Sequence, residues 1–540
     1  MQRQQDEKVP GAPRGYTERL CAMSIVKHES RKTENRSRKR VGECRKGLLL
    51  LPFIGGLFLL WYVLHATVDV VYSDYIRIIN SYLPDILDPT SFFVPDLLTR
   101  IPINYPLRWI NVTFFGYSVL FDRVLCILGC VLLMCSVAQY LIRERSGVWI
   151  ILPVMLVGFS LDKWEMLLNG TGCVHFLSYG LFFYHYLVLE RVFTGTQQPG
   201  DVRRLYLLPW LSLLVAGPYI VQYTATLLVA YGYLAFLRNR NVDGRRLPWY
   251  GLCALVPLVL YYMSNATATF EHTGAQDIGL LETLQQYHGF SLHFLLNGFA
   301  STLLSGSVLE DMLAAGTLTY PMVYLMGALV ILLYASAVLL YFRTGQYRRT
   351  IFPMLLLVSG AGSHVLVFLS RYIFLTETYA WQSRYGLQYL PGTLGLLLIY
   401  GAASAHFRQQ YRAVYGRPGD DPAVRKADAA GDTSPLRRGR ARKAQASSRQ
   451  VQALRALLGI GLSLVVLLSF TAGTCYTDKR EIDAMPFRQM YFGSIADAAR
   501  DYENLSDDEL NLIFEYHHGP NRVRHAMDIL KENQWNVFRK

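Results

Sequence analysis

GLLLLPFIGGLFLLWYVLHATV, residues 47–68, is the first of several apolar runs that are long enough to cross a lipid bilayer. A membrane-spanning helix needs about 20 mainly apolar residues, and this run contains no Asp, Glu, Lys or Arg. Of the 540 residues, 52% are hydrophobic and only 17% are charged, whereas soluble proteins have about 25% charged residues. The sequence therefore predicts an all-α, polytopic helical membrane protein.

The distribution of basic residues predicts the direction of each span. Cytoplasmic loops of membrane proteins are enriched in Lys and Arg, and residues 1–46 are polar and basic. We therefore expect a cytoplasmic N-terminus and an extracytoplasmic C-terminus, with about eleven spans. The predicted spans are 47–68, 123–142, 150–159, 172–189, 205–216, 221–236, 248–263, 320–342, 351–370, 385–405 and 451–470.

FSLHFLLNGFASTLLSGSVL, residues 290–309, has two interpretations. If it spans the membrane, the basic loop 343–349 lies outside; if it is re-entrant, that loop lies in the cytoplasm, as the charge rule prefers. Its Gly, Ser, Asn and His content is polar for a helix facing lipid, which favours the re-entrant interpretation.

The chain divides into five predicted parts. Residues 47–405 form a transmembrane domain with a large first extracytoplasmic loop, 69–117, and residues 451–471 form the last span. A small extracytoplasmic helical hairpin, 472–540, is predicted because Ser506 and Glu509 have the spacing of a helix capping box. The tail 1–46 and the linker 406–450 are basic and low in apolar residues, which is typical of disordered segments.

Composition also limits the partners of the chain. The net charge of +13 concentrates in residues 1–46 and 406–450, which have no platform of aromatic residues for stacking on nucleic-acid bases. We therefore expect no nucleic-acid partner. The cysteines form no CxxC pair and no zinc-binding spacing with histidine, and His517 and His518 fit two surface histidines at a helix end. The sequence predicts no metal site and no cofactor.

Asp74 lies in the first loop, within TVDVVYSDYIRIINSYLPDILD, residues 67–88. Its apolar residues recur at i, i+3, i+4 and i+7, so we expect an amphipathic helix that lies on the membrane surface and has Asp74 near its start. A helix N-cap is an alternative role for Asp74. The other acidic residues of this segment, Asp69, Asp85 and Asp88, compete with it for a catalytic role.

SLDKWEMLLNGTG, residues 160–172, places three ionisable side chains and a tryptophan between two apolar runs. Ionisable groups near membrane spans are costly and often functional, which makes Lys163, Trp164 and Glu165 candidates. An interfacial turn with an aromatic anchor is the alternative. The short runs around Gln222 favour broken or tilted helices that line a cavity.

SRYIFLTETYAWQSRYGLQYLPG, residues 370–392, brings Trp381, Arg384 and Tyr385 to the start of a predicted span. A guanidinium is planar and can bind a phosphate through two N–H groups, so Arg384 suits a lipid-borne phosphate. A snorkelling arginine is the alternative. Under the predicted topology this segment lies on the same side of the membrane as Asp74 and Glu165.

With VVYSDYIRI after the first span, FSLDKWEMLLNGTG after a short third span and SRY at residues 383–385, the chain resembles the GT-C glycosyltransferases. The likeness is to bacterial members that use polyprenyl-phosphate-linked sugars, and it covers roughly residues 47–405 in the order of elements. Many GT-C enzymes have two adjacent acidic residues in the first loop, where this chain has Asp74 between Ser73 and Tyr75.

The resemblance implies an inverting, metal-independent transfer of a sugar from a polyprenyl-phosphate donor to a glycan or lipid-linked acceptor. Asp74 would act as the general base, and Arg384 and Lys163 would bind the donor phosphate. Glu165, Trp164, Gln222, Trp381 and Tyr385 would bind sugar or acceptor. The expected location is the bacterial inner membrane, in contact with its lipids. Two other functions remain open: a non-catalytic envelope assembly factor, and a polysaccharide transporter or polymerase.

Overall fold

The computed structural model describes residues 47–88, 101–266, 274–415 and 435–539, which are helical and contain no strand. The chain divides into two units, Met1–Leu51 and Pro52–Lys540. The predicted tail 1–46 lies outside the described residues. Every packing contact given below belongs to the second unit.

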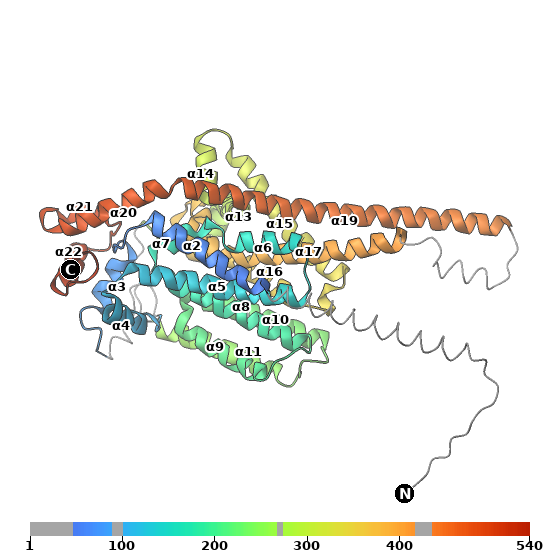
Figure 1. Cartoon of the computed structure of the whole chain (residues 1–540), viewed down its shortest axis with the longest axis horizontal. Coiled ribbons are helices and arrows are strands. Elements are labelled where there is room, and N and C mark those ends of the chain that lie inside the picture. Colours follow the sequence, from blue (N-terminus) through green and yellow to red (C-terminus); the bar gives the residue numbers. More distant parts are fainter. Residues whose placement is uncertain (1–46, 89–100, 267–273, 416–434, 540) are drawn as a thin grey trace, which may run out of the picture. The chain divides into compact units, whose positions relative to one another are not determined.

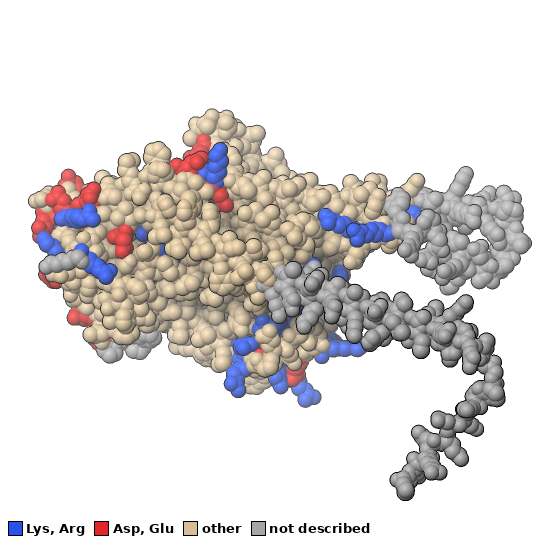
Figure 2. Space-filling view, viewed as in Figure 1, with Lys and Arg blue, Asp and Glu red and all other residues tan. Residues whose placement is uncertain are grey.

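Eight helices are long and apolar enough to cross a membrane, which confirms the helical membrane class. On the face shown in Figure 2, uncharged residues cover most of the surface between the two ends, apart from one group of acidic and basic side chains at the top. The eight are Gly47–Ala66 (η1 and α2), Val119–Arg143 (α5), Gly217–Leu237 (η4 and α10), Leu247–Ser264 (α11), Tyr320–Arg343 (α15), Phe352–Phe374 (α16 and η6), Ser383–Val414 (η8 and most of α17) and Arg449–Asp483 (within α19).

Three predicted spans are helical without reaching that standard of length and hydropathy. They correspond to α6 (Val148–Gly158), α8 (Cys173–Phe193) and α9 (Asp201–Val215). Helices α6 and α9 have 11 and 15 residues, whereas a span needs about 20. The total of eleven spans therefore stays a prediction, while a helix occupies each of the eleven positions.

The long helices pack lengthwise, with α5 along α8, α16 along α17, and α17 along α19 (Figure 1). Glycine permits a close approach between α16 and α17. A Cβ on Gly360 would lie 2.2 Å from the backbone of Gly392, so any larger side chain there would push the two helices apart.

The two ends of this bundle differ. At the basic end, α5, α8 and α15 finish and α16 (Phe352–Arg371) begins; there Glu190 accepts hydrogen bonds from the backbone N–H groups of Ile351 and Phe352, at 2.6 and 2.8 Å. At the opposite end, the loop end, α16 finishes and α17 (Gly386–Tyr415) begins; there Arg371 donates a 2.7 Å hydrogen bond to the Tyr385 hydroxyl.

Residues 290–309 form no single helix. Helix α13 (His288–Ala300) is followed by a turn and by α14 (Gly306–Ala314), and its 13 residues extend only about 20 Å. Phe299 stacks on His364 of α16 inside the bundle, with ring centroids 3.8 Å apart. After the turn, Glu310 of α14 accepts a 3.0 Å hydrogen bond from the Trp381 indole. The segment enters from the loop end and returns to it, which favours the re-entrant interpretation.

The first loop contains two helices where the sequence predicts one, α3 (Asp74–Tyr82) and α4 (Asn104–Phe115). The predicted position of α3 on the membrane surface is wrong, because protein covers its apolar stripe. Helix α22 (Arg522–Glu532) packs against α3, and Asn80 donates a 3.0 Å hydrogen bond to the Arg522 carbonyl. Buried residues of α3 are Tyr75, Ile76, Ile78, Ile79 and Tyr82.

The C-terminal boundaries differ from the prediction. Helix α17 extends to Tyr415, and α19 runs from Pro435 to Asp483, so both ends of the predicted disordered linker 406–450 are helical. Residues 416–434 lie outside the described residues. The predicted hairpin includes three helices, α20 (Met485–Arg500), α21 (Asp507–Ile513) and α22. The predicted capping box is present: Ser506 and Glu509 exchange both of its hydrogen bonds.

Candidate functional site

The segment 160–172 folds as two short helices, η3 (Leu161–Lys163) and α7 (Trp164–Asn169), at the loop end. Asp478 of α19 accepts a 2.7 Å hydrogen bond from the Leu161 N–H. On the other side, Ser383 donates its hydroxyl to the Asp162 carbonyl at 2.7 Å and accepts from the Glu165 N–H at 3.3 Å. Hydrogen bonds on both sides hold the segment in place, so it forms a wall between α19 and the start of α17.

Glu165 and Arg384 form the accessible ion pair of this wall. Their carboxylate and guanidinium are 2.7 Å apart, and 27% and 43% of the two side chains remain exposed. The Glu165 carboxylate binds Arg384, while the nearby Lys163 pairs with Asp162. Because Arg384 has five N–H groups and one carboxylate does not occupy them all, the guanidinium can still receive an anion.

Asp74 occupies the first turn of α3, close to this pair. Half of its side chain is exposed, and its carboxylate lies 3.8 Å from Arg77. It also interacts electrostatically with Arg384 and with His175 at the start of α8. The N-cap residue of α3 is Ser73, and its side chain makes no capping hydrogen bond. Asp74 is the first residue inside the helix, so it is a half-exposed carboxylate among cations rather than the N-cap.

Polar and aromatic side chains surround these charges. Tyr219 receives a 2.9 Å hydrogen bond from Gln388 and lies within electrostatic reach of Arg371 and Arg384. The His175 ring meets the Tyr219 ring edge-on at 4.6 Å. Within the described part of the chain, His175 Nδ1 is buried and has no hydrogen-bond partner. The site thus contains one buried imidazole nitrogen that no described residue satisfies.

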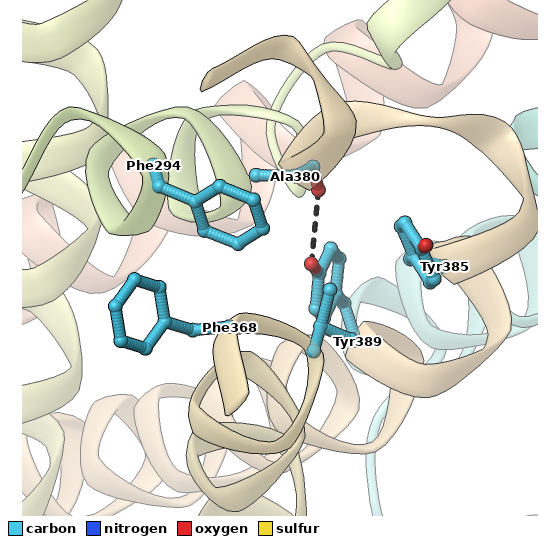
Figure 3. Close-up of a cluster of buried hydrophobic side chains, with 6 residues drawn as sticks. Phe294, Phe368, Ala380, Tyr385 and Tyr389 are labelled. Carbon is cyan, nitrogen blue, oxygen red and sulfur yellow. Dashed lines mark hydrogen bonds between the residues drawn. The ribbon is translucent and has the colours of Figure 1, made fainter. Parts of the chain in front are cut away.

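Apolar side chains form the base of the site and join α13 to α16 and α17. Figure 3 shows Phe294 of α13 facing Phe368 of α16, while the Tyr389 hydroxyl donates a 2.9 Å hydrogen bond to the Ala380 carbonyl. Tyr385 belongs to this cluster and is 3% exposed. It therefore positions Arg371 through its hydroxyl and presents little surface to a sugar.

Lys163 lies inside the protein, with 1% of its side chain exposed. Its ammonium donates to the Ser160 carbonyl at 2.6 Å and pairs with Asp162 at 2.9 Å. Burial alone would lower the pKa of Lys163, but the Asp162 carboxylate outweighs it and the pKa is raised. The charge is retained and already compensated, so this geometry favours a role in holding the turn.

The two tryptophans have structural partners. The Trp164 indole lies under the Arg488 guanidinium, 3.7 Å from the ring centroid, and donates a 3.3 Å hydrogen bond to Ser307. Trp381 is 2% exposed and belongs to a core cluster with Ala300 and Val323. Of the two, Trp164 alone retains an accessible surface at the site, since it is only partly buried.

Gln222 lies away from this group, inside the bundle. Its amide donates a 2.5 Å hydrogen bond to the Ser359 carbonyl of α16 and accepts one from Tyr179 of α8 at 3.1 Å. The side chain is 4% exposed. It therefore links three helices and has no direct access to the Asp74 neighbourhood through these contacts.

Sequence reasoning missed Arg77 and His175 as members of the site. Arg77 follows Asp74 at i+3, the spacing that places two side chains on one helix face. His175 is an isolated ionisable residue in the apolar run after residue 172, which was a usable signal. Within the described residues there is no cluster of three or more His, Cys, Asp or Glu side chains that could hold a metal ion.

An apolar cavity of about 690 Å³ runs between α4, α5, α8 and α9. One part is lined by Ile103 of the first loop and Val215, which precedes η4 (Gly217–Tyr219); the other part reaches Gln139 near the end of α5. The cavity therefore extends from the loop end toward the basic end, and its lining is almost entirely apolar.

Comparison of the chain with protein families, with curated proteins and with solved structures finds no match. The chemical interpretation therefore depends on the geometry of the loop end.

Proposed function

We propose that the chain is a membrane glycosyltransferase that transfers a sugar from a polyprenyl-phosphate donor to a glycan or lipid-linked acceptor. The observation that carries the proposal is the group formed by Asp74, Glu165 and Arg384: a half-exposed carboxylate within electrostatic reach of an accessible guanidinium. Such a pair offers a base for an acceptor hydroxyl and a cation for a leaving phosphate.

In the proposed reaction, Asp74 removes the proton from the acceptor hydroxyl while the oxygen attacks the anomeric carbon. The bond between that carbon and the phosphate oxygen breaks with inversion, and the polyprenyl phosphate leaves with its electron pair. Arg384 stabilises the charge that develops on the phosphate. Glu165 holds the guanidinium in place between turnovers, and Trp164 borders the sugar.

The donor would approach from the membrane. The apolar cavity of about 690 Å³ provides room for part of an isoprenoid chain beside α5, α8 and α9, and its lining near Ile103 brings the head of such a lipid toward the loop end. The basic residues of the opposite end support a cytoplasmic position for that end, because cytoplasmic loops are enriched in Lys and Arg. The site would then face the exterior of the inner membrane.

The test is replacement of the native gene by variants, with mass spectrometry of envelope glycans and of polyprenyl-phosphate-linked sugars. Asp74→Asn and Arg384→Ala should leave a glycan missing and the lipid-linked sugar accumulated, as in a deletion strain. Asp85→Asn, which changes an exposed carboxylate of the same loop, should restore both. If Asp74→Asn and Arg384→Ala restore the native glycan at normal protein abundance, the proposal fails.

A further inference from the structure

A second cavity, of about 420 Å³, lies at the basic end of the bundle, away from Asp74 and Arg384. The turn after α5, the start of α6, the short helix η5 (Gln346–Arg348) and the last part of α17 form its walls. Four arginines, Arg145, Arg349, Arg408 and Arg412, line it together with His406.

Within the part of the chain that the structure describes, no carboxylate forms an ion pair with the arginines of this cavity. In the described ranges, Arg145, Arg408 and Arg412 have no carboxylate within ion-pair distance, and Glu144, the acidic residue of the lining, binds Arg143 at 3.3 Å. Arg349 donates to the Thr344 carbonyl at 3.1 Å, which leaves its charge uncompensated. Four guanidinium groups around one cavity repel one another, so an anion that enters it is stabilised by all four.

The lining also has an apolar part. Ile150 of α6 and Leu398 and Ala402 of α17 lie beside the arginines, and Gly401 lets the two helices meet, since a Cβ there would contact Ile150 at 3.0 Å. Trp149 stacks against the Arg408 guanidinium at 4.2 Å. Tryptophan is enriched at membrane interfaces, so this cavity has the composition of a site at headgroup depth.

From this arrangement we propose that the basic-end cavity binds the phosphate headgroup of an anionic membrane lipid. Arginine binds phosphate through paired N–H groups, and basic pockets between membrane helices on the cytoplasmic side bind anionic lipid heads. The apolar lining favours a lipid over a free phosphate, because the first carbons of the acyl chains contact Ile150 and Leu398 while the phosphate contacts the arginines.

The experiment uses the full-length chain in a neutral detergent. Short-chain phosphatidylglycerol, short-chain phosphatidylcholine and inorganic phosphate are titrated separately, and binding is followed by Trp fluorescence and by the melting temperature. We expect saturable binding of phosphatidylglycerol alone. Arg408→Gln/Arg412→Gln should weaken it by about tenfold, while Arg203→Gln/Arg245→Gln, exposed arginines at the same end and outside the cavity, should bind as the native chain does.

Three results would overturn the proposal. Equal binding of the zwitterionic lipid shows that the arginines select nothing, and inorganic phosphate that binds equally well shows a soluble anion as the ligand. Unchanged affinity in Arg408→Gln/Arg412→Gln places the lipid elsewhere. If that variant fails to fold, Arg145→Gln/Arg349→Gln tests the opposite wall of the cavity. The preference of the native chain for phosphatidylglycerol over phosphatidylcholine tests the proposal without any variant.

Discussion

The two ends of the bundle carry cations in different ways. At the loop end, two accessible arginines are paired with carboxylates: Arg384 binds Glu165 at 2.7 Å, and Arg480 binds Asp311 at 2.8 Å. At the basic end, Arg145, Arg408 and Arg412 surround a cavity without a carboxylate partner among the described residues. An anion at the loop end therefore shares a guanidinium with a carboxylate, whereas at the basic end it adds to an unbalanced charge.

This difference has a consequence for what each end can do. A paired arginine is held in one geometry by its carboxylate and can bind a phosphate through its remaining N–H groups, which suits a ligand that binds and leaves. An unpaired cluster binds an anion without displacing an internal partner, which suits a resident lipid. Variants that change one end at a time test whether the pairing of charges at that end controls stability or activity.

The largest expected effect concerns the buried pair of Arg108 and Asp122 at the loop end. Their side chains are 2% and 0% exposed, and Asp122 also accepts a 2.8 Å hydrogen bond from Tyr75 of α3. Removing one partner of a buried pair costs about 3–5 kcal/mol, because the other charge stays buried. Arg108→Met should lower the free energy of unfolding by that amount in detergent denaturation.

Arg108→Met/Asp122→Leu is the matched control, since removal of both charges should recover much of the lost stability. Lys531→Met breaks an exposed pair with Glu503 and should cost under about 1 kcal/mol. Equal losses in Arg108→Met and Lys531→Met would show that pairing at the loop end adds nothing beyond surface electrostatics.

The next effect concerns catalysis at the accessible pair. Loss of one group that stabilises transition-state charge typically lowers kcat by about a hundredfold or more. Arg384→Ala should show that loss in a sugar-transfer assay, with thermal stability close to native because the residue is half exposed. Arg384→Lys keeps the charge without the planar group, so its activity should fall between the two. Native activity in Arg384→Ala would remove the phosphate role from this residue.

The sequence predicts the helices better than their ends. Apolar runs locate eleven helices because lipid-facing and core-facing residues are both apolar in a membrane bundle. The same criterion misses α4 (Asn104–Phe115) and the extensions of α17 and α19, whose polar turns continue a helix outside the apolar run. The burial of α3 also depends on α22, hundreds of residues away, which no local pattern indicates.

For the candidate site, the sequence predicts which polar segments lie at one end and fails to predict the side-chain partners. Glu165 binds Arg384 while Lys163 binds Asp162 and the Ser160 carbonyl within its own turn. Spacing alone does not determine that turn. Trp381 is another example: its indole lies in the core because α14 returns beside it with Glu310.

At the basic end, Asp201 provides a paired contrast to the open cavity. Its buried carboxylate receives hydrogen bonds from Arg191 at 2.8 Å and from Arg204 at 2.6 Å. Burial alone would raise the pKa of Asp201, but these hydrogen bonds outweigh it and the pKa lies below its ordinary value of 3.8. Asp201→Asn should lower the free energy of unfolding by about 2 kcal/mol at neutral pH.

The pH dependence follows from the direction of that pKa shift. A lowered folded-state pKa means that the stabilisation is present above pH 3.8 and is lost as the pH falls through the folded value. The stability difference between the native chain and Asp201→Asn should therefore be largest at neutral pH and shrink below about pH 4. Asp243→Asn, at an exposed pair with Arg246, should show a small difference throughout; a constant gap for Asp201→Asn would contradict the pairing.

The smallest effect concerns the support that the C-terminal helices give to Asp74. Ser506 caps α21, and the Phe514 carbonyl just after that helix accepts a 2.7 Å hydrogen bond from the Ser73 N–H. Ser506→Ala should cost about 1 kcal/mol of local stability, and hydrogen exchange at the Ser73 amide should accelerate. Ser494→Ala, an exposed residue of α20, is the control. If exchange at Ser73 stays slow in Ser506→Ala, the C-terminal helices hold α3 through the α22 contact alone, and α21 plays no part in positioning the carboxylate at the loop end.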